Sequence, residues 1–209
     1  MIEIIKNASF DHAGGFYFYR VHQPKVDSLC KELSNLKKYL SSIFNECPHA
    51  YFNEGPRSSK LKRKLNCDLI EIRGHEVSAL ARIGGKENSE RYKTAHSRVQ
   101  VFMLENDGAT IATEVPIWIT KTEFSALKIN KPLTGHIDLL RIEDGYIWIW
   151  DYKPNAKGER YAATQVYFYA LMLSKRTGIK LDRFRCGYFD EEVAYMFKPK
   201  EDSSLKRFF

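Results

Sequence analysis

The sequence predicts an α/β (α+β) fold, in which a central mixed β-sheet is flanked by helices. Three observations lead to this prediction. Two apolar runs enclose Asp144-Gly145, a preferred two-residue turn, and therefore predict a β-hairpin. Apolar residues recur at helical spacing from Val26 to Phe44 and again from Ala162 to Arg176. Helices that alternate with groups of strands in this way are typical of a mixed sheet with helices packed on it.

The length, composition and net charge of the chain favour one globular domain over residues 1–209 with a basic surface. The chain of 209 residues has a formal net charge of +7, and 44% of its residues are apolar. Lysine and arginine spread along a chain supply sequence-independent affinity for nucleic acid, so this charge balance fits a polyanion partner. No apolar stretch approaches the roughly 20 residues that span a bilayer, and the N-terminus does not resemble a secretion signal. We therefore expect no membrane association and an intracellular, cytoplasmic location.

Residues 1–85 are expected to form a mainly helical N-terminal portion. The first twenty residues have no clear period and predict no element. The helix from Val26 to Phe44 stops near Cys47-Pro48, and a loop-like run follows from Asn53 to Asn66. This run is either a solvated surface or a contact to a nucleic-acid backbone. Its basic residues are Arg57, Lys60, Lys62, Arg63 and Lys64.

Residues 86–198 are expected to hold the functional core. Gly84-Gly85 is expected to separate the N-terminal portion from a second helix. The predicted elements are a helix over Glu87 to Leu104, a strand over Ala109 to Ile119, the Gly135 to Tyr152 hairpin, a helix over Ala162 to Arg176, and two strands within Arg183 to Phe197. Gly178 is placed as the left-handed C-cap of the last helix.

The register of the hairpin predicts a metal site. If Asp144-Gly145 is the turn, counting outward places Asp138 opposite Asp151, with Lys153 on the same face. Facing carboxylates in a partly buried sheet repel each other and require a cation. Magnesium and manganese are held by one or two carboxylates, and such an ion activates water for attack on a phosphodiester. Asp138 and Asp151 are therefore candidate ligands of Mg²⁺ or Mn²⁺, and Lys153 is a candidate catalytic residue.

Four further residues are candidates on weaker grounds. His96 shares an apolar helical face, which suits a packing residue or a metal ligand. Glu114 lies in a strand whose active face cannot be counted from the hairpin. Gln165 and Tyr169 are one helical turn apart and face the same way, as a surface pair or as part of a site.

In their order along the chain, Glu114, Gly135-x-x-Asp138, Asp151-x-Lys153 and Gln165-x-x-x-Tyr169 resemble the PD-(D/E)XK nuclease superfamily, in particular its RecB-like branch with CRISPR-associated and viral relatives. The resemblance implies a restriction-endonuclease-like core. It implies that His96, Asp138 and Asp151 bind the metal and that Lys153 is the catalytic lysine. Glu114, Gln165 and Tyr169 would complete the catalytic set.

The segment from Ser41 to Phe52 is similar to the N-terminal segment of the CRISPR-associated branch, where a cysteine binds an iron–sulfur cluster with three cysteines of a C-terminal tail. Here the only later cysteines are Cys67 and Cys186, and the tail from Met196 to Phe209 has none. A cluster needs its thiolate ligands. We therefore expect no iron–sulfur cluster, with Cys30, Cys47 and Cys67 left as free or structural thiols. The compact size also resembles the nucleases of crenarchaeal viruses, whose location would be the host cytoplasm.

Together these observations predict a metal-dependent deoxyribonuclease. By analogy with the branch, exonuclease or end-directed action on DNA is the favoured mode. Two alternatives remain open at this point. One is a catalytically silent DNA-binding or assembly module, and the other is a resolvase of branched DNA, which would act as a homodimer.

Overall fold

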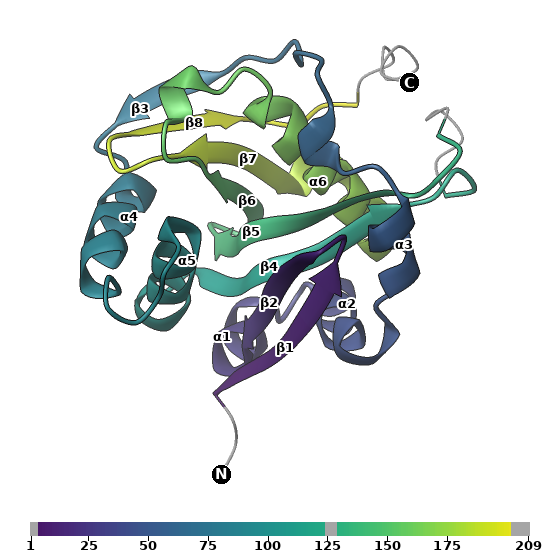
Figure 1. Cartoon of the computed structure of the whole chain (residues 1–209), viewed down its shortest axis with the longest axis horizontal. Helices are drawn as coiled ribbons and strands as arrows, with labels where there is room; N and C mark the ends of the chain where they lie inside the picture. The colour runs from purple at the N-terminus through teal and green to yellow at the C-terminus, as the bar shows by residue number, and fades with distance from the viewer. Residues whose placement is uncertain (1–3, 124–128, 202–209) are drawn as a thin grey trace.

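The computed structural model describes residues 4–123 and 129–201 (Figure 1). Eight strands form one sheet in the order β1-β2-β4-β5-β6-β7-β8-β3. Only β6 and β7 pair in parallel, so the sheet is mixed, as the sequence predicts. Residues 1–3 and 202–209, which belong to the N-terminal segment and the cysteine-free tail considered above, lie outside the described residues.

The strands and helices alternate along the chain. The strands are β1 (Ile5–His12), β2 (Gly15–His22), β3 (Ile70–Arg73), β4 (Thr110–Ile119), β5 (Leu133–Glu143), β6 (Tyr146–Tyr152), β7 (Phe184–Phe189) and β8 (Val193–Phe197). The α-helices are α1 (Gln23–Leu29), α2 (Ser34–Glu46), α3 (His49–Glu54), α4 (Glu76–Glu87), α5 (Ala95–Asn106) and α6 (Ala162–Thr177). Short 3-10 turns cover Ser58–Lys60, Ala156–Gly158 and Leu181–Arg183.

The N-terminal portion combines helices with three strands. The first twenty residues, for which the sequence predicts no element, fold into the β1–β2 hairpin, whose turn residues Ala13 and Gly14 both have positive φ. The single helix expected from Val26 to Phe44 is wrong, because the chain leaves helical geometry between Cys30 and Leu33. This break lets α1 contact β2 and β4 while α2 turns to contact α6.

The expectation that Gly84-Gly85 separates two parts of the chain is also wrong. Both glycines lie inside α4, and the next helix begins only at Ala95, where the side chain of Thr94 caps it. A Cβ atom added at Gly84 would lie 2.6 Å from Cβ of Phe102 on α5. The glycine therefore permits the close approach of α4 and α5, a packing role that a local reading of the sequence does not distinguish from a boundary.

The two faces of the sheet carry separate apolar clusters. The larger cluster joins α2 and α6 to the central strands, and the smaller one joins α4 and α5 to β5, β6, β7 and β8. Figure 1 shows α4 and α5 side by side, on the side of the sheet away from α6. No helix in the described part of the chain is long and apolar enough to cross a bilayer.

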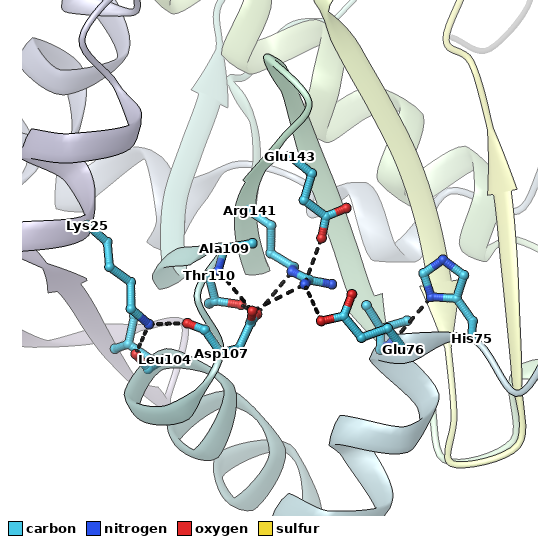
Figure 2. A network of polar contacts seen from close by, with 10 residues as sticks. Lys25, His75, Glu76, Leu104, Asp107, Ala109, Thr110, Arg141 and Glu143 are labelled. Atoms are coloured by element: carbon cyan, nitrogen blue, oxygen red, sulfur yellow. Dashed lines mark hydrogen bonds and ion pairs between the residues drawn. The ribbon is translucent and has the colours of Figure 1, made fainter.

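A buried ion-pair network fixes the loop between α5 and β4 against β5 (Figure 2). The guanidinium of Arg141 is 1% exposed and lies 3.0 Å from Oδ2 and 3.2 Å from Oδ1 of Asp107. Glu143 and Glu76 also contact Arg141, at 2.6 and 3.4 Å. The backbone carbonyl of Asp107 accepts a hydrogen bond from Lys25 of α1. The network thus connects the N-terminal portion to the central strand of the sheet.

Candidate metal-binding active site

The hairpin of β5 and β6 has the predicted register. Asp144 and Gly145 have φ values of 50° and 73°, as a type I′ turn requires, and Glu143 pairs with Tyr146. The ladder continues to the pair Leu139–Trp150, so Asp138 and Asp151 face each other one step beyond it.

Asp138 and Asp151 are both buried at the end of this ladder. They are 8% and 1% exposed. The strands separate here because Oδ2 of Asp138, at 3.0 Å, accepts the hydrogen bond of the Tyr152 backbone N–H. One carboxylate oxygen of Asp138 is thereby held in place while the other is left for a ligand.

Lys153 follows directly after β6 and joins the same group. Its ammonium lies 2.6 Å from Oδ2 of Asp151. The strand itself ends at Tyr152, but the backbone N–H of Lys153 still donates to the carbonyl of Phe189 at 2.8 Å. The next residue, Pro154, favours an extended conformation at Lys153. The backbone of Lys153 is therefore held both by its hydrogen bond to Phe189 and by the extended conformation that Pro154 favours.

Glu114 reaches the site through a local irregularity in β4. Thr113 pairs with Leu139 and Val115 with Ile137, so Glu114 stands opposite Asp138 but outside the ladder, with φ of 50°. A positive φ is uncommon for glutamate and turns its side chain away from the normal alternation. The amide of Gln100 on α5 donates to Oε1 of Glu114 at 2.7 Å. The sequence analysis missed Gln100, whose only signal was a polar residue on an otherwise apolar helical face.

His96 approaches the carboxylates from α5. Its Nε2 lies 3.8 Å from Oδ2 of Asp138, and its ring meets that of Tyr152 edge-on. The imidazole is half-buried, and burial lowers its pKa. It is therefore neutral near pH 7, the form in which histidine binds a metal.

Gln165 and Tyr169 lie on α6 behind the site and are buried. The alternative that they form a pair on the protein surface is therefore wrong. The Gln165 amide lies 2.9 Å from Oδ1 of Asp151 and 2.8 Å from the Tyr169 hydroxyl, to both of which it donates. Gly135 of β5 makes room for this contact, because a Cβ atom there would lie 2.3 Å from the Tyr169 ring. The glycine of the G-x-x-D pattern thus permits α6 to support Asp151.

Burial dominates the electrostatics of the three carboxylates. It raises the pKa values of Asp138, Asp151 and Glu114 to about 7, and the repulsion between neighbouring carboxylates adds to the effect. Burial alone would lower the pKa of Lys153, but attraction to Asp151 and Asp138 outweighs it and raises the pKa. At neutral pH the site therefore holds a charged ammonium and an incompletely ionised set of acids.

This donor set fits a hard divalent cation. Oδ2 of Asp151 is buried without a hydrogen-bond partner and lies 2.6 Å from the Lys153 ammonium, while Oδ2 of Asp138 accepts the hydrogen bond of the Tyr152 backbone N–H. A dication would relieve the repulsion that raises the carboxylate pKa values. Asp138 and Asp151 offer the oxygen ligands that Mg²⁺ and Mn²⁺ prefer, with His96 and Glu114 at the rim.

Arg57 is a neighbour of the site that the sequence analysis placed only in a basic loop. The loop before it follows β5, because Pro56 accepts the hydrogen bond of the Thr134 backbone N–H at 2.9 Å. The guanidinium stacks over the Tyr17 ring at 4.9 Å and lowers the pKa values of both Glu114 and Asp138. Arg57 is half-buried and brings a positive charge to the edge of the acidic site.

Replacing Gln165 with leucine is expected to reduce metal-dependent turnover by about 10- to 100-fold, because Asp151 loses the amide that orients it. Tyr169→Phe, which keeps that amide, is the matched comparison and should cost less. Metal titrations followed by calorimetry should show weaker binding in Gln165→Leu than in Tyr169→Phe. Equal metal affinity in both variants would contradict a positioning role for Gln165.

Comparisons with known proteins agree with this geometry. The sequence profile of the PD-(D/E)XK nuclease superfamily matches residues 49–204, which include every candidate site residue named in the sequence analysis. No curated protein sequence matches the chain significantly. A solved structure titled "Crystal structure of SSO0001" is 13% identical, with 84% of this chain and 81% of that chain covered and a TM-score of 0.41, a level that does not by itself establish a common fold.

The match covers about three quarters of the chain and contains the hairpin, the Glu114 strand and α6. The mixed sheet flanked by helices is consistent with the restriction-endonuclease-like core expected of such proteins. The chain belongs to the PD-(D/E)XK nuclease superfamily.

Proposed function

We propose that this protein is a divalent-metal-dependent deoxyribonuclease that hydrolyses phosphodiester bonds at the Asp138–Asp151–Lys153 site. One observation carries the proposal. Two buried carboxylates face each other across a hairpin, with a lysine ammonium 2.6 Å from one of them. Such a site binds a cation and a phosphate side by side, which suits phosphodiester hydrolysis.

Each residue has a distinct part in the proposed reaction. Asp138 and Asp151 hold Mg²⁺ or Mn²⁺, with His96 as an additional ligand and Glu114 as a further acidic group. When bound, the ion lowers the pKa of a water molecule and neutralises charge on the phosphoryl oxygens. Lys153 adds a second positive charge and orients the attacking oxygen. Gln165, supported by Tyr169, keeps Asp151 in place.

The positive charge around the site suits DNA as the substrate. The net charge of +7 provides general attraction for a polyanion. Arg57, beside the carboxylates, is placed to contact the phosphate next to the one that is cut. By the resemblance to the RecB-like branch with its CRISPR-associated and crenarchaeal viral members, we propose exonuclease or end-directed action.

The direct test is cleavage of end-labelled linear, closed circular and branched DNA with Mg²⁺, with Mn²⁺ and with chelator. We expect degradation of linear DNA that requires the metal, while closed circles survive. A Lys153→Ala preparation, purified in parallel, should be inactive, since it lacks the ammonium beside Asp151. Equal activity in that preparation or in chelator would contradict the proposal.

The same experiment separates the two alternatives. A catalytically silent DNA-binding module would bind the substrates and cut none of them with either metal. A resolvase would cut branched DNA in preference to linear DNA and would behave as a homodimer in sedimentation. Cleavage of closed circles without a branch would instead indicate a general endonuclease at the same site.

A further inference from the structure

A second group of metal-ligand side chains lies outside the carboxylate site. His12 at the end of β1, Cys47 after α2, and His49 at the start of α3 present ligand atoms that all lie within 4.8 Å of one another. Nε2 of His12 and Nδ1 of His49 are 3.0 Å apart. The end of β1 and the Cys47-Pro48-His49 segment, which are distant in the sequence, thus bring two imidazoles and a thiol to one point.

We propose that His12, Cys47 and His49 form a mononuclear site for a divalent transition metal of the zinc type. Zinc prefers nitrogen and sulfur ligands in tetrahedral geometry, and three protein ligands with one open position are a recurrent arrangement. Zinc–nitrogen bonds of about 2.0 Å and zinc–sulfur bonds of about 2.3 Å separate neighbouring ligand atoms by roughly 3.3 to 3.5 Å. To reach these separations the two imidazole nitrogens, now 3.0 Å apart, would move slightly apart, and the distances to the Cys47 sulfur, at most 4.8 Å, would shorten.

The surroundings of His12 support this assignment. When Nε2 of His12 binds the metal, its Nδ1–H is free to donate to Nε2 of His136, which lies 2.9 Å away. A metal-bound histidine usually donates its second ring N–H in this way, which fixes the tautomer and the ring orientation. The His12 ring also stacks on Phe52 of α3 with centroids 4.1 Å apart. The imidazole is therefore oriented before a metal arrives.

The site is buried on one side and open on the other. His12 and Cys47 are buried, whereas His49 is exposed, so the fourth ligand is a water molecule from solvent. Burial lowers the pKa of His12 to about 4, so this imidazole is neutral at pH 7. Burial also raises the pKa of Cys47 to about 12, so formation of the metal–sulfur bond must release the thiol proton to the buffer.

The ion would connect the N-terminal hairpin to the catalytic strand. The backbone N–H of Ala13 in the hairpin turn already donates to Oδ1 of Asn53 on α3 at 2.7 Å. His136 belongs to β5 and stands two residues before Asp138. Its ring stacks on Tyr17 with centroids 3.8 Å apart. A metal on His12 would thus hold β1, α3 and β5 together.

The test measures binding of Zn²⁺ and Co²⁺ by the full chain, stripped of metal and kept in excess Mg²⁺. We expect one equivalent of tightly bound Zn²⁺, a higher melting temperature on its addition, and a Co²⁺ spectrum with a thiolate charge-transfer band. The band should be lost in Cys47→Ser and retained in Cys67→Ser, a half-buried thiol outside the cluster. It should also be retained in Asp138→Asn, which disables only the carboxylate site.

His49→Gln keeps the test decisive if Cys47→Ser does not fold, because His49 is exposed. This variant should lose the tight Zn²⁺ equivalent and the zinc-dependent rise in melting temperature. Zinc binding that is unchanged in His49→Gln, that depends on Asp138 instead, or that is not detected at all would overturn the proposal. The three histidines would then form a hydrogen-bonded chain without a metal, and the proposed nuclease activity would be unaffected.

Discussion

Asp151→Asn is expected to lower the rate of DNA cleavage by about 10³-fold or more while DNA binding persists. Metal stabilisation of the reaction is worth several kcal/mol, and each 1.4 kcal/mol or so is a factor of ten in rate. The amide cannot supply the negative charge that holds the ion against its hydration shell. Single-turnover cleavage with excess enzyme and a gel-shift assay in chelator measure the two quantities separately.

Asp182→Asn is the matched control, because Asp182 lies in the 3-10 turn before β7, on a different part of the chain from the carboxylate site. It should cleave at the wild-type rate. Cleavage by Asp151→Asn at that same rate would mean that the activity belongs to another site or another protein. Loss of DNA binding in Asp151→Asn alone would instead show that the carboxylate acts mainly in folding.

Asp107→Ala is expected to destabilise the protein by about 3 kcal/mol, the lower end of the usual cost of removing one member of a buried ion pair, because Arg141 then keeps only the more exposed Glu143 and Glu76 as partners. Arg141 and Asp107 have side chains that are 1% and 2% exposed, and two guanidinium nitrogens contact the two carboxylate oxygens (Figure 2). The carboxylate also accepts hydrogen bonds from the Ala109 backbone N–H and the Thr110 hydroxyl. Urea denaturation followed by fluorescence gives the free energy of unfolding.

Glu76→Gln tests the same network from its exposed end. The Glu76 side chain is 64% exposed, so its ion pair with Arg141 is screened by solvent and should contribute at most about 1 kcal/mol. Replacing both partners, as Asp107→Leu with Arg141→Met, should recover much of the loss, because neither of the two fully buried charges then remains. A loss in Asp107→Ala no larger than in Glu76→Gln would refute this account.

The central hairpin shows how much of the site can be predicted from local sequence. Asp144-Gly145 permits the positive φ values of a type I′ turn, and the turn alone sets the register. From that register the approach of Asp138 and Asp151 follows by counting. The last helix was predictable for a similar reason, since its periodicity and the left-handed Gly178 are local properties.

The helices of the first half were harder to predict because their limits depend on distant contacts. The apolar spacing from Val26 to Phe44 continues through the break between α1 and α2. This break lets α1 contact β2 and β4 while α2 contacts α6. The Gly84-Gly85 pair looks like a boundary between elements, but Gly84 lies inside α4 and permits the close approach of Phe102 on α5. A short window of sequence contains no signal for the helix break or for this contact between helices.

The sequence by itself determined the mixed sheet, the turn of the β5–β6 hairpin and the facing positions of its two aspartates, because turn geometry and hydrophobic period act between near neighbours. Only the tertiary structure decided that Glu114 turns toward Asp138, that His96 comes within 3.8 Å of the same carboxylate, and that Arg57 lies beside it. These contacts join strands and helices separated by many residues. Their geometry depends on how whole elements pack, which no local pattern encodes.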